Sequence, residues 1–312
     1  MAANLVAAVD VGGTSVKAAV YEGVFEGRGF DGERPHVVAS LRAATELSGD
    51  PAGSVTRQVA RMIGELTAAT GPVLAAGVVV PGIVDEAAGV ARFAANLGWR
   101  DAPLRKMLEA LLPSPVAFGH DVTAGGLAEY RIGAARGFGS AAFVPVGTGI
   151  AAALVLDGKP YRAAGHAGEL GHLDVGHGVR CGCGATGCLE VVASASALAR
   201  RYARRTGKVV AGSLEVVAAA RTGDPDAEAV LADAVAALGD GLRTLVTLLA
   251  PDVVVLGGGL FRSGEFLLGR VRRRLADGLT FQPLPEVRLA ELGDEAGCLG
   301  AGLLAADLVA GR

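Results

Sequence analysis

The chain has 312 residues, of which 51% are hydrophobic and 20% are charged, and its formal net charge is −3 at pH 7. This length is typical of two domains, and the apolar content is enough to fill a large buried core. An acidic chain without a basic stripe is not expected to bind nucleic acid. No apolar run reaches the roughly 18–20 residues of a membrane-spanning helix, so no membrane partner is expected either.

The N-terminal segment is predicted to be a strand rather than a targeting signal. Its apolar run over residues 5–9 is short, lacks a basic leader and stops at Asp10. The cysteines agree with a reducing compartment, because three of the four fall within eight positions, as in a metal site. These features predict a cytoplasmic protein.

Strand and helix signals alternate along the first part of the chain. Residues 5–10 and 16–21 are predicted to form a hairpin of buried strands around Gly12, Gly13 and Thr14. Apolar side chains at helical spacing predict a helix over residues 52–70. The remaining elements expected here are a loop over 22–36, a strand over 73–80, a helix over 103–112 and a strand over 116–118.

A second cycle with the same plan begins near residue 119. A helix over 123–135 is followed by a second hairpin, 141–146 and 151–156, around the turn Gly147-Thr148-Gly149. A segment rich in glycine, histidine and cysteine covers residues 165–188. Beyond it we expect helices over 190–205, 213–221 and 226–249, a strand over 252–256, a helix over 264–276, a strand over 286–290 and a helix over 296–310.

Two halves that repeat one plan predict an α/β protein with a cleft between two similar domains. The expected small N-terminal α/β domain covers residues 1–118, and the C-terminal helix, 296–312, returns to it. The expected large α/β domain covers residues 119–295 and carries the cysteine-rich loop.

Three glycine-rich loops are candidate phosphate-binding sites. In the segment DVGGTSVK, Asp10 to Lys17, the glycines expose backbone N–H groups, Thr14 adds a hydroxyl donor and Asp10 is placed to hold Mg²⁺. An ordinary tight hairpin is the alternative, and the spacing of a Walker loop is absent. Gly147, Thr148 and Gly149 repeat this chemistry, so the two loops are expected to bind the β- and γ-phosphates of ATP. Gly257, Gly258 and Gly259 follow a buried strand, which suits the adenosine side.

Cys181, Cys183 and Cys188 predict a metal site, because such density is otherwise unexplained in a chain with four cysteines. Three thiolates need a fourth ligand to complete a tetrahedron. His172 is the best candidate, with His166 and His177 as competitors. A closed set of three cysteines and one histidine leaves no position for water and therefore predicts a structural rather than a catalytic Zn²⁺.

Asp10 to Lys17, Gly147 to Gly149, Glu169 to His172 and the cysteine cluster together resemble the ROK family of sugar kinases and repressors, from about residue 5 to 305. The resemblance implies a two-domain actin-like ATPase (ribonuclease H-like) fold with an interdomain cleft. It also implies ATP and Mg²⁺ as cofactors, a structural Zn²⁺ with His172 as a ligand, and a homodimer.

The same resemblance implies the residues that bind a hexose. Glu169 and Glu190 match positions that accept hydrogen bonds from sugar hydroxyls, and His172 is expected to use one ring nitrogen for the sugar and the other for zinc. Asn96 and Gly82 match further sugar contacts. Solvated surface carboxylates are the alternative for the two glutamates.

Asp121 is the predicted catalytic base. The resemblance places the base before an alanine- and glycine-rich helix, here Thr123 to Glu129, where an aspartate takes the proton of the attacking sugar hydroxyl. A helix N-cap is the alternative. The family usually has Asn-Asp at this point and this chain has His120-Asp121, so we expect an altered sugar preference or a pH-sensitive pocket.

The predicted function is therefore an ATP-dependent hexose kinase, with glucose as the leading substrate and an N-acetylhexosamine or fructose as the alternatives. Polyphosphate remains open as a second phosphoryl donor. A repressor of the same family is disfavoured, because the first hairpin begins at residue 5 and leaves no room for a helix-turn-helix domain ahead of it. A non-catalytic sugar sensor is disfavoured because Asp10, Gly12, Gly13, Thr14 and Asp121 are all present.

Overall fold

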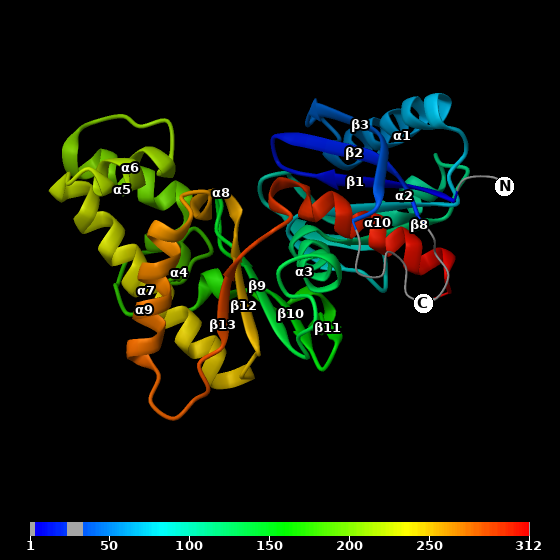
Figure 1. Cartoon of the computed structure of the whole chain (residues 1–312). Coiled ribbons are helices and arrows are strands. Elements are labelled where there is room, and N and C mark those ends of the chain that lie inside the picture. Colours follow the sequence, from blue (N-terminus) through cyan, green and yellow to red (C-terminus); the bar gives the residue numbers. More distant parts are fainter. Residues whose placement is uncertain (1–3, 24–33, 312) are drawn as a thin grey trace. The chain divides into compact units, whose positions relative to one another are not determined.

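The computed structural model describes residues 4–23 and 34–311, and these fall into two compact units (Figure 1). The first unit comprises the described residues of Met1–Arg136, Pro160–Ala167 and Asp294–Arg312, and the second comprises Gly137–Lys159 and Gly168–Gly293. The helix that follows residue 120 thus groups with the first unit, whereas the boundary expected from the sequence lay near residue 118. Each unit is described below by itself.

The first unit is built on a five-stranded mixed sheet of order β3-β2-β1-β4-β8, and it also contains a three-stranded sheet, β5-β6-β7. In the larger sheet β2 is antiparallel to both neighbours, while β1, β4 and β8 are parallel to one another. The elements are β1 (Leu5–Val11), β2 (Ser15–Glu22), β3 (His36–Ala44), α1 (Pro51–Thr70), β4 (Ala75–Val80), β5 (Ile83–Asp85), β6 (Val90–Ala94), β7 (Trp99–Ala102), α2 (Leu104–Glu109), β8 (Val116–His120), α3 (Asp121–Ile132), a 3₁₀ turn (Ala163–Gly165) and α10 (Ala296–Val309).

The second unit repeats this plan. Its sheet has the order β11-β10-β9-β12-β13, with β10 antiparallel to β9, and with β9, β12 and β13 parallel. The predicted duplication of one α/β motif is confirmed, because both sheets share this arrangement. The elements are β9 (Ala141–Pro145), β10 (Ala153–Leu156), a 3₁₀ turn (Leu170–His172), α4 (Leu189–Ala193), α5 (Ala195–Thr206), α6 (Ser213–Arg221), α7 (Pro225–Leu249), β12 (Val253–Gly257), α8 (Gly258–Phe261), α9 (Glu265–Gly278) and β13 (Glu286–Leu289). Strand β11 (Lys159–Tyr161) and the 3₁₀ turn Gly293–Glu295 each contain residues assigned to both units.

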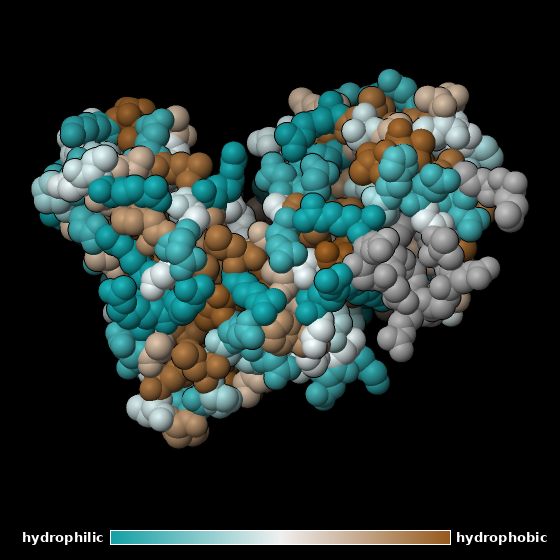
Figure 2. All heavy atoms as spheres, in the orientation of Figure 1, coloured by the Kyte–Doolittle hydropathy of each residue, from teal (hydrophilic) through white to brown (hydrophobic). Residues whose placement is uncertain are grey.

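Each unit has its own hydrophobic core. In the first unit, Ala7 and Val9 join α1 and α2 in one apolar cluster, whereas Ala8 lies on the opposite face of β1, toward Gly302 of α10. The sheet is therefore covered on both faces. On the side of the molecule seen in Figure 2, apolar and hydrophilic side chains are interspersed over both units. No helix among the described residues is both long enough and apolar enough to cross a membrane.

Two differences from the predicted elements have clear causes. The single helix expected over 190–205 is wrong: Ser194 is extended (φ −67°, ψ 156°) and its hydroxyl accepts a hydrogen bond from the Ala197 N–H, so α4 ends and α5 begins there. Strand β3 was not predicted, because it lies at a sheet edge and most of its side chains are exposed or half-exposed. The loop predicted over 22–36 lies mostly outside the described residues.

Helix α10 approaches the first sheet closely through glycine contacts. A Cβ added to Gly77 of β4 would overlap the Ala301 carbonyl oxygen, and one added to Gly300 would overlap the carbonyl oxygen of Ala124 in α3. These two glycines let the C-terminal helix pack between the sheet and α3 at backbone distance. The C-terminus is thereby part of the first unit's fold.

Gly77→Ala should lower the free energy of unfolding by about 2 kcal/mol or more, because the added methyl group meets rigid backbone rather than a side chain that can move. Gly64→Ala is the matched control. Gly64 lies inside α1 with no atom within 4 Å of an added Cβ, so this change should raise stability by up to about 1 kcal/mol. Thermal or urea unfolding measures both. Equal stability of the two variants would contradict the proposed packing.

Candidate functional site

In the first unit, a turn that contains Gly12 and Gly13 joins β1 to β2. The Gly12 N–H donates to the Ser15 carbonyl at 2.9 Å, and the Thr45 hydroxyl donates to the Gly12 carbonyl at 2.7 Å, which fix the turn from both sides. Thr14 is exposed at its tip. A Cβ on Gly13 would lie 2.7 Å from Asn96 Nδ2, so the predicted sugar residue Asn96 lies directly against the predicted phosphate loop.

Asp10 lies at the base of this turn in an unfavourable environment for its charge. Burial, followed by the nearby Asp121 carboxylate, raises the pKa of Asp10 to about 7, although Lys17 opposes the shift. The Lys17 ammonium lies 3.9 Å from the Asp10 carboxylate and also donates to the Asp294 carbonyl. Lys17 therefore acts as the charge partner of Asp10. A divalent cation, as predicted for this position, would relieve the remaining repulsion between the two carboxylates.

Asp121 is the first residue of α3, and its carboxylate is held by two neighbours. Its Oδ1 accepts from the Val122 N–H at 2.7 Å and lies 3.1 Å from His120 Nε2. The other ring nitrogen of His120, Nδ1, lies 3.2 Å from the Thr123 hydroxyl. The N-cap position belongs to His120, not to Asp121. Asp121, with a side chain 26% exposed, is thus oriented by His120 while remaining accessible.

Glu86 is a residue at this site that the sequence analysis missed. Its Oε1 accepts from the His120 N–H at 3.2 Å, and its Oε2 forms an ion pair with Arg162. Glu86 therefore positions the segment that carries His120. No sequence signal could have linked these groups, which lie 34 and 76 positions apart. Gly82, predicted as a sugar contact, has φ +97°, and a Cβ there would overlap the Phe93 carbonyl oxygen, so it also has a backbone role.

In the second unit, two of the predicted glycine loops lie side by side. The Val146 N–H donates to the Gly257 carbonyl at 2.9 Å and the Leu260 N–H donates to the Val146 carbonyl at 3.1 Å. Gly258 has φ +79°, and a Cβ there would lie 2.6 Å from the Val146 backbone, which only glycine permits. Gly147, Thr148 and Gly149 are thus brought next to Gly257, Gly258 and Gly259.

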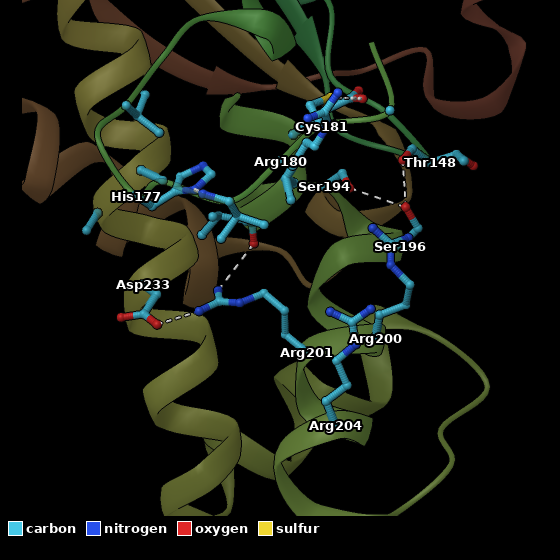
Figure 3. Close-up of a pocket in the computed structure, with 18 of the residues that line it drawn as sticks. Thr148, His177, Arg180, Cys181, Ser194, Ser196, Arg200, Arg201, Arg204 and Asp233 are labelled. Carbon is cyan, nitrogen blue, oxygen red and sulfur yellow. Dashed lines mark hydrogen bonds and ion pairs between the residues drawn. The ribbon is translucent and has the colours of Figure 1, made fainter. Parts of the chain in front are cut away.

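The start of α5 anchors the first of these loops. The Ala195 N–H donates to the Gly147 carbonyl at 2.8 Å, and the Ser196 hydroxyl donates to the Thr148 carbonyl at 2.7 Å (Figure 3). On the far side of the glycine triplet, Gly259 and Arg262 line a cavity of about 340 Å³ together with the beginning of α6. This cavity adjoins the loop that the sequence assigned to the adenosine side.

The predicted zinc ligands converge in the second unit. One ligand atom from each of His172, Cys181, Cys183 and Cys188 lies within 4.8 Å of every other. The sulfurs of Cys183 and Cys188 are 3.7 Å apart and His172 Nδ1 is 3.9 Å from the Cys181 sulfur. A tetrahedral Zn²⁺ with Zn–S bonds near 2.3 Å requires ligand separations of about 3.6–3.8 Å, so the four residues fit this ion.

The structure separates His172 from its two competitors. His177 uses Nε2 to contact the Cys188 carbonyl at 2.9 Å and Nδ1 to accept from the Val179 N–H at 3.1 Å, so both nitrogens hold the loop backbone. His166 belongs to the first unit and is exposed. His172 directs Nδ1 toward Cys181, while its Nε2 lies 3.9 Å from the Glu169 carboxylate. Its second nitrogen is thus left on the side of Glu169.

Glu169 and Glu190 are both tied to this cluster. Gly168 and Gly171 flank Glu169, and a Cβ on either would overlap a carbonyl oxygen of the second hairpin, Ala152 or Ile150. Glu190 Oε1 lies 3.8 Å from the Cys181 sulfur, and its other oxygen would lie 2.9 Å from a Cβ on Gly149. Glu190 therefore lies between the metal cluster and the second phosphate loop.

We expect the purified protein to contain one zinc ion per chain and Cys183→Ser to lose it, because three ligands bind Zn²⁺ far more weakly than four. Cys298→Ala is the matched control, since Cys298 is a buried cysteine of the first unit, outside the cluster. Atomic absorption measures the metal and thermal unfolding measures the expected loss of stability. Full zinc content in the Cys183 variant would contradict the assignment.

Asp10→Asn should make the protein more stable at neutral pH. The folded-state pKa of about 7 lies above the ordinary 3.8, so the ionised carboxylate lowers the free energy of unfolding increasingly as the pH rises between these values. The difference in unfolding free energy between variant and wild type should therefore grow as the pH rises from about 3.8 to about 7, to at most roughly 4 kcal/mol, and level off above that. Denaturant unfolding without added Mg²⁺ or nucleotide measures it.

Asp277→Asn is the control for this series, because Asp277 is exposed on α9 and has no hydrogen bond or ion pair among the described residues. Its stability difference from the wild type should not change with pH in this range. A constant difference for Asp10→Asn as well would show that Asp10 titrates as an ordinary surface aspartate.

Comparison with known proteins gives one consistent result. The chain is 29% identical to a glucokinase of Streptomyces coelicolor over 97% of this chain and 98% of the relative. A ROK hexokinase from Thermus thermophilus superimposes with a TM-score of 0.84 at 34% identity, over 99% of this chain and all of the other. A ROK family glucokinase from Streptomyces griseus, solved in complex with glucose and AMPPNP, gives a TM-score of 0.81 at 30% identity, over 97% and 99%. These structures confirm the predicted actin-like hexokinase fold. The sequence profile of the ROK family matches residues 6–308, and the chain belongs to this family.

Proposed function

We propose that the protein is an ATP-dependent hexose kinase, with glucose as substrate and glucose 6-phosphate as product. The observation that carries this proposal is the carboxylate of Asp121, which is oriented by His120 and by the Val122 N–H, and which is close enough to Asp10 to raise its pKa. In such a pair, Asp121 can accept a proton while Asp10 binds a cation. The glucokinase from Streptomyces griseus that the chain resembles was solved with glucose and an ATP analogue.

The proposed step is a phosphoryl transfer in which Asp121 is the general base. Asp121 accepts the proton of the sugar hydroxyl while the oxygen of that hydroxyl forms a bond to the γ-phosphorus, and the bond from this phosphorus to the ADP oxygen breaks. Asp10 would hold Mg²⁺, which would supply charge neutralisation on the phosphates. The N–H groups of the two hairpin turns at Gly13–Thr14 and Thr148–Gly149 would contribute hydrogen bonds to the same charge. Those of Gly12 and Gly147 donate to carbonyls within the turns.

The sugar is proposed to be recognised by Asn96, His120 and Gly82 in the first unit and by Glu169, His172 and Glu190 in the second. Because Nδ1 of His172 lies toward the cysteine cluster, a bound zinc ion would fix the ring and would leave Nε2 to bind a hydroxyl. The zinc is therefore proposed to be structural, and its effect on the reaction is to hold Glu169, His172 and Glu190 in place.

An N-acetylhexosamine or fructose is the alternative acceptor, since His120 stands where the family usually has asparagine. A non-catalytic sugar sensor is the alternative function, since the ROK family includes repressors. The presence of both acidic residues, Asp10 and Asp121, supports catalysis. A substrate that is phosphorylated with ATP is consistent with a cytoplasmic location, and we propose a homodimer by analogy with the family.

A coupled assay of ADP release with ATP, Mg²⁺ and a panel of hexoses should give the highest kcat/KM with glucose. Asp121→Asn should reduce kcat by about 10²–10⁴-fold, because the general base is lost while the contacts to the sugar remain. Glucose affinity, measured by calorimetry, should change less than about threefold in the same variant, as expected when only the transition state loses an interaction.

Asp101→Asn is the control for this assay, because Asp101 is exposed and pairs only with Arg92 among the described residues. Its kcat should equal that of the wild type. Turnover of the Asp121 variant at the wild-type rate would exclude Asp121 as the base. Absence of turnover with every hexose in the zinc-loaded wild type would favour the sensor.

A further inference from the structure

The start of α3 carries a row of three polar side chains in contact, Asp121, His120 and Thr123. The Nε2 atom of His120 lies 3.1 Å from Asp121 Oδ1, and the Nδ1 atom lies 3.2 Å from the Thr123 hydroxyl. Both ring nitrogens of His120 therefore face a polar group of the same helix turn. The proposed reaction gives roles to Asp121 and His120 but none to Thr123.

The chemistry of the two contacts decides which nitrogen of the neutral His120 ring carries the hydrogen. An ionised carboxylate only accepts hydrogen bonds, so Nε2 must be the donor to Asp121. The Nδ1 atom of that tautomer has a lone pair and can only accept, so the Thr123 hydroxyl must be its donor. In the other neutral tautomer, a lone pair of Nε2 would face the lone pairs of the carboxylate.

The Thr123 hydroxyl is available for this bond. It has no other hydrogen bond within residues 4–23 and 34–311, whereas the hydroxyls of Thr70 and Thr244 donate to the carbonyl four residues earlier in their helices. His120 is the N-cap residue of α3 and Thr123 is the third residue of the helix. Side chains at these two positions lie close together at a helix start, as they do in a capping box.

The backbone of His120 is also fixed, and this determines which oxygen of Asp121 is free. Glu86 Oε1 accepts from the His120 N–H at 3.2 Å, and His120 pairs with Val80 in the sheet. Asp121 Oδ1 therefore faces two fixed donors, His120 Nε2 and the Val122 N–H at 2.7 Å. Its Oδ2 has no hydrogen bond or ion pair in the part of the chain that the structure describes, so Oδ2 is the oxygen left to accept a proton.

We propose that Thr123 is a positioning residue of the kinase. Its hydroxyl selects the Nε2–H tautomer of His120, this tautomer holds Asp121 Oδ1, and Oδ2 then accepts the proton of the sugar hydroxyl. The inference rests on the proposed role of Asp121 as the base, and it follows the general rule that a third group orients the base of a catalytic set. Both ring nitrogens of His120 are used within the chain, so any contact of His120 with the sugar is made by the carbon atoms of its ring.

The tautomer can be measured without substrate, by ¹⁵N NMR of the histidine rings in the zinc-loaded protein at about pH 8. The chain has five histidines, and the signals lost in His120→Gln identify those of His120. In the wild type, Nε2 of His120 should be protonated and Nδ1 should not. Thr123→Val should shift both signals toward the other tautomer, because the donor to Nδ1 is lost, and Thr123→Ser should restore them.

The effect on the reaction is measured in the ADP-release assay with glucose. Thr123→Val should lower kcat about three- to tenfold, which is the effect expected for the loss of one hydrogen bond. The KM for glucose should change less than about twofold, because Thr123 does not bind the sugar. Thr123→Ser keeps the hydroxyl and should recover the wild-type kcat.

Thr70→Val is the matched control, because the Thr70 hydroxyl also bonds within its own helix, to the Leu66 carbonyl at 2.9 Å in α1. Its NMR signals and kcat should equal those of the wild type. An unprotonated Nε2 in the wild type, or protonation of both nitrogens of His120, would overturn the tautomer. Wild-type kcat in Thr123→Val, or no recovery in Thr123→Ser, would overturn the positioning role. A wild type that turns over no hexose would contradict the proposed kinase instead, and the spectra would still decide the tautomer.

Discussion

The candidate site of the first unit depends on the burial of one carboxylate, that of Asp10. Burial and the Asp121 carboxylate both oppose its ionisation, and only Lys17 favours it. The surrounding structure enforces this position: Asp10 is part of β1 in the middle of the sheet, and Gly297 of α10 packs directly against it, where a Cβ would lie 2.6 Å from the carboxylate. A buried carboxylate that lowers the stability of the fold is expected where a cation or a reacting group must be bound.

In the second unit, the shape of the loop that carries the candidate sugar-binding residues depends on the cysteine cluster. The segment from Gly168 to Cys188, which carries the cluster, has few buried apolar side chains, and glycines recur at its turns. Two hydrogen bonds between the His177 ring and the backbone hold this segment in a defined shape. The ligand atoms of His172 and the three cysteines converge in it, at distances that suit one metal ion. Because Glu169 flanks His172 and Glu190 follows Cys188 closely, the geometry of the sugar-binding candidates depends on the same ligands.

Glycine has two separate functions in this chain, which the residue count alone does not distinguish. Some glycines form the tight turns between strands, as at Gly12, whose N–H donates to the Ser15 carbonyl, and at Gly147, whose N–H donates to the Gly149 carbonyl. Others permit close contact between elements, as at Gly77 of β4 against α10, at Gly300 of α10 against α3 and at Gly258 against Val146. The second group brings α10 onto its sheet and brings the two glycine loops of the second unit together. Close backbone packing at these glycines therefore acts together with side-chain contacts such as Glu86 to His120 in positioning the polar groups.

The sequence alone determined the features that depend on local pattern. Strand and helix periodicity predicted most elements and the repeated plan of the two sheets, and the spacing of Cys181, Cys183 and Cys188 predicted the metal cluster, because ligands within eight positions must converge. Only the tertiary structure decided what depends on residues distant in the chain. It selected His172 over His177 by the bonds that His177 makes, linked Glu86 to His120, raised the pKa of Asp10 through burial, and placed α3 with the first sheet by packing it on α10. Solvent exclusion and contacts between remote segments set these properties, and neither is encoded in any local window of the sequence.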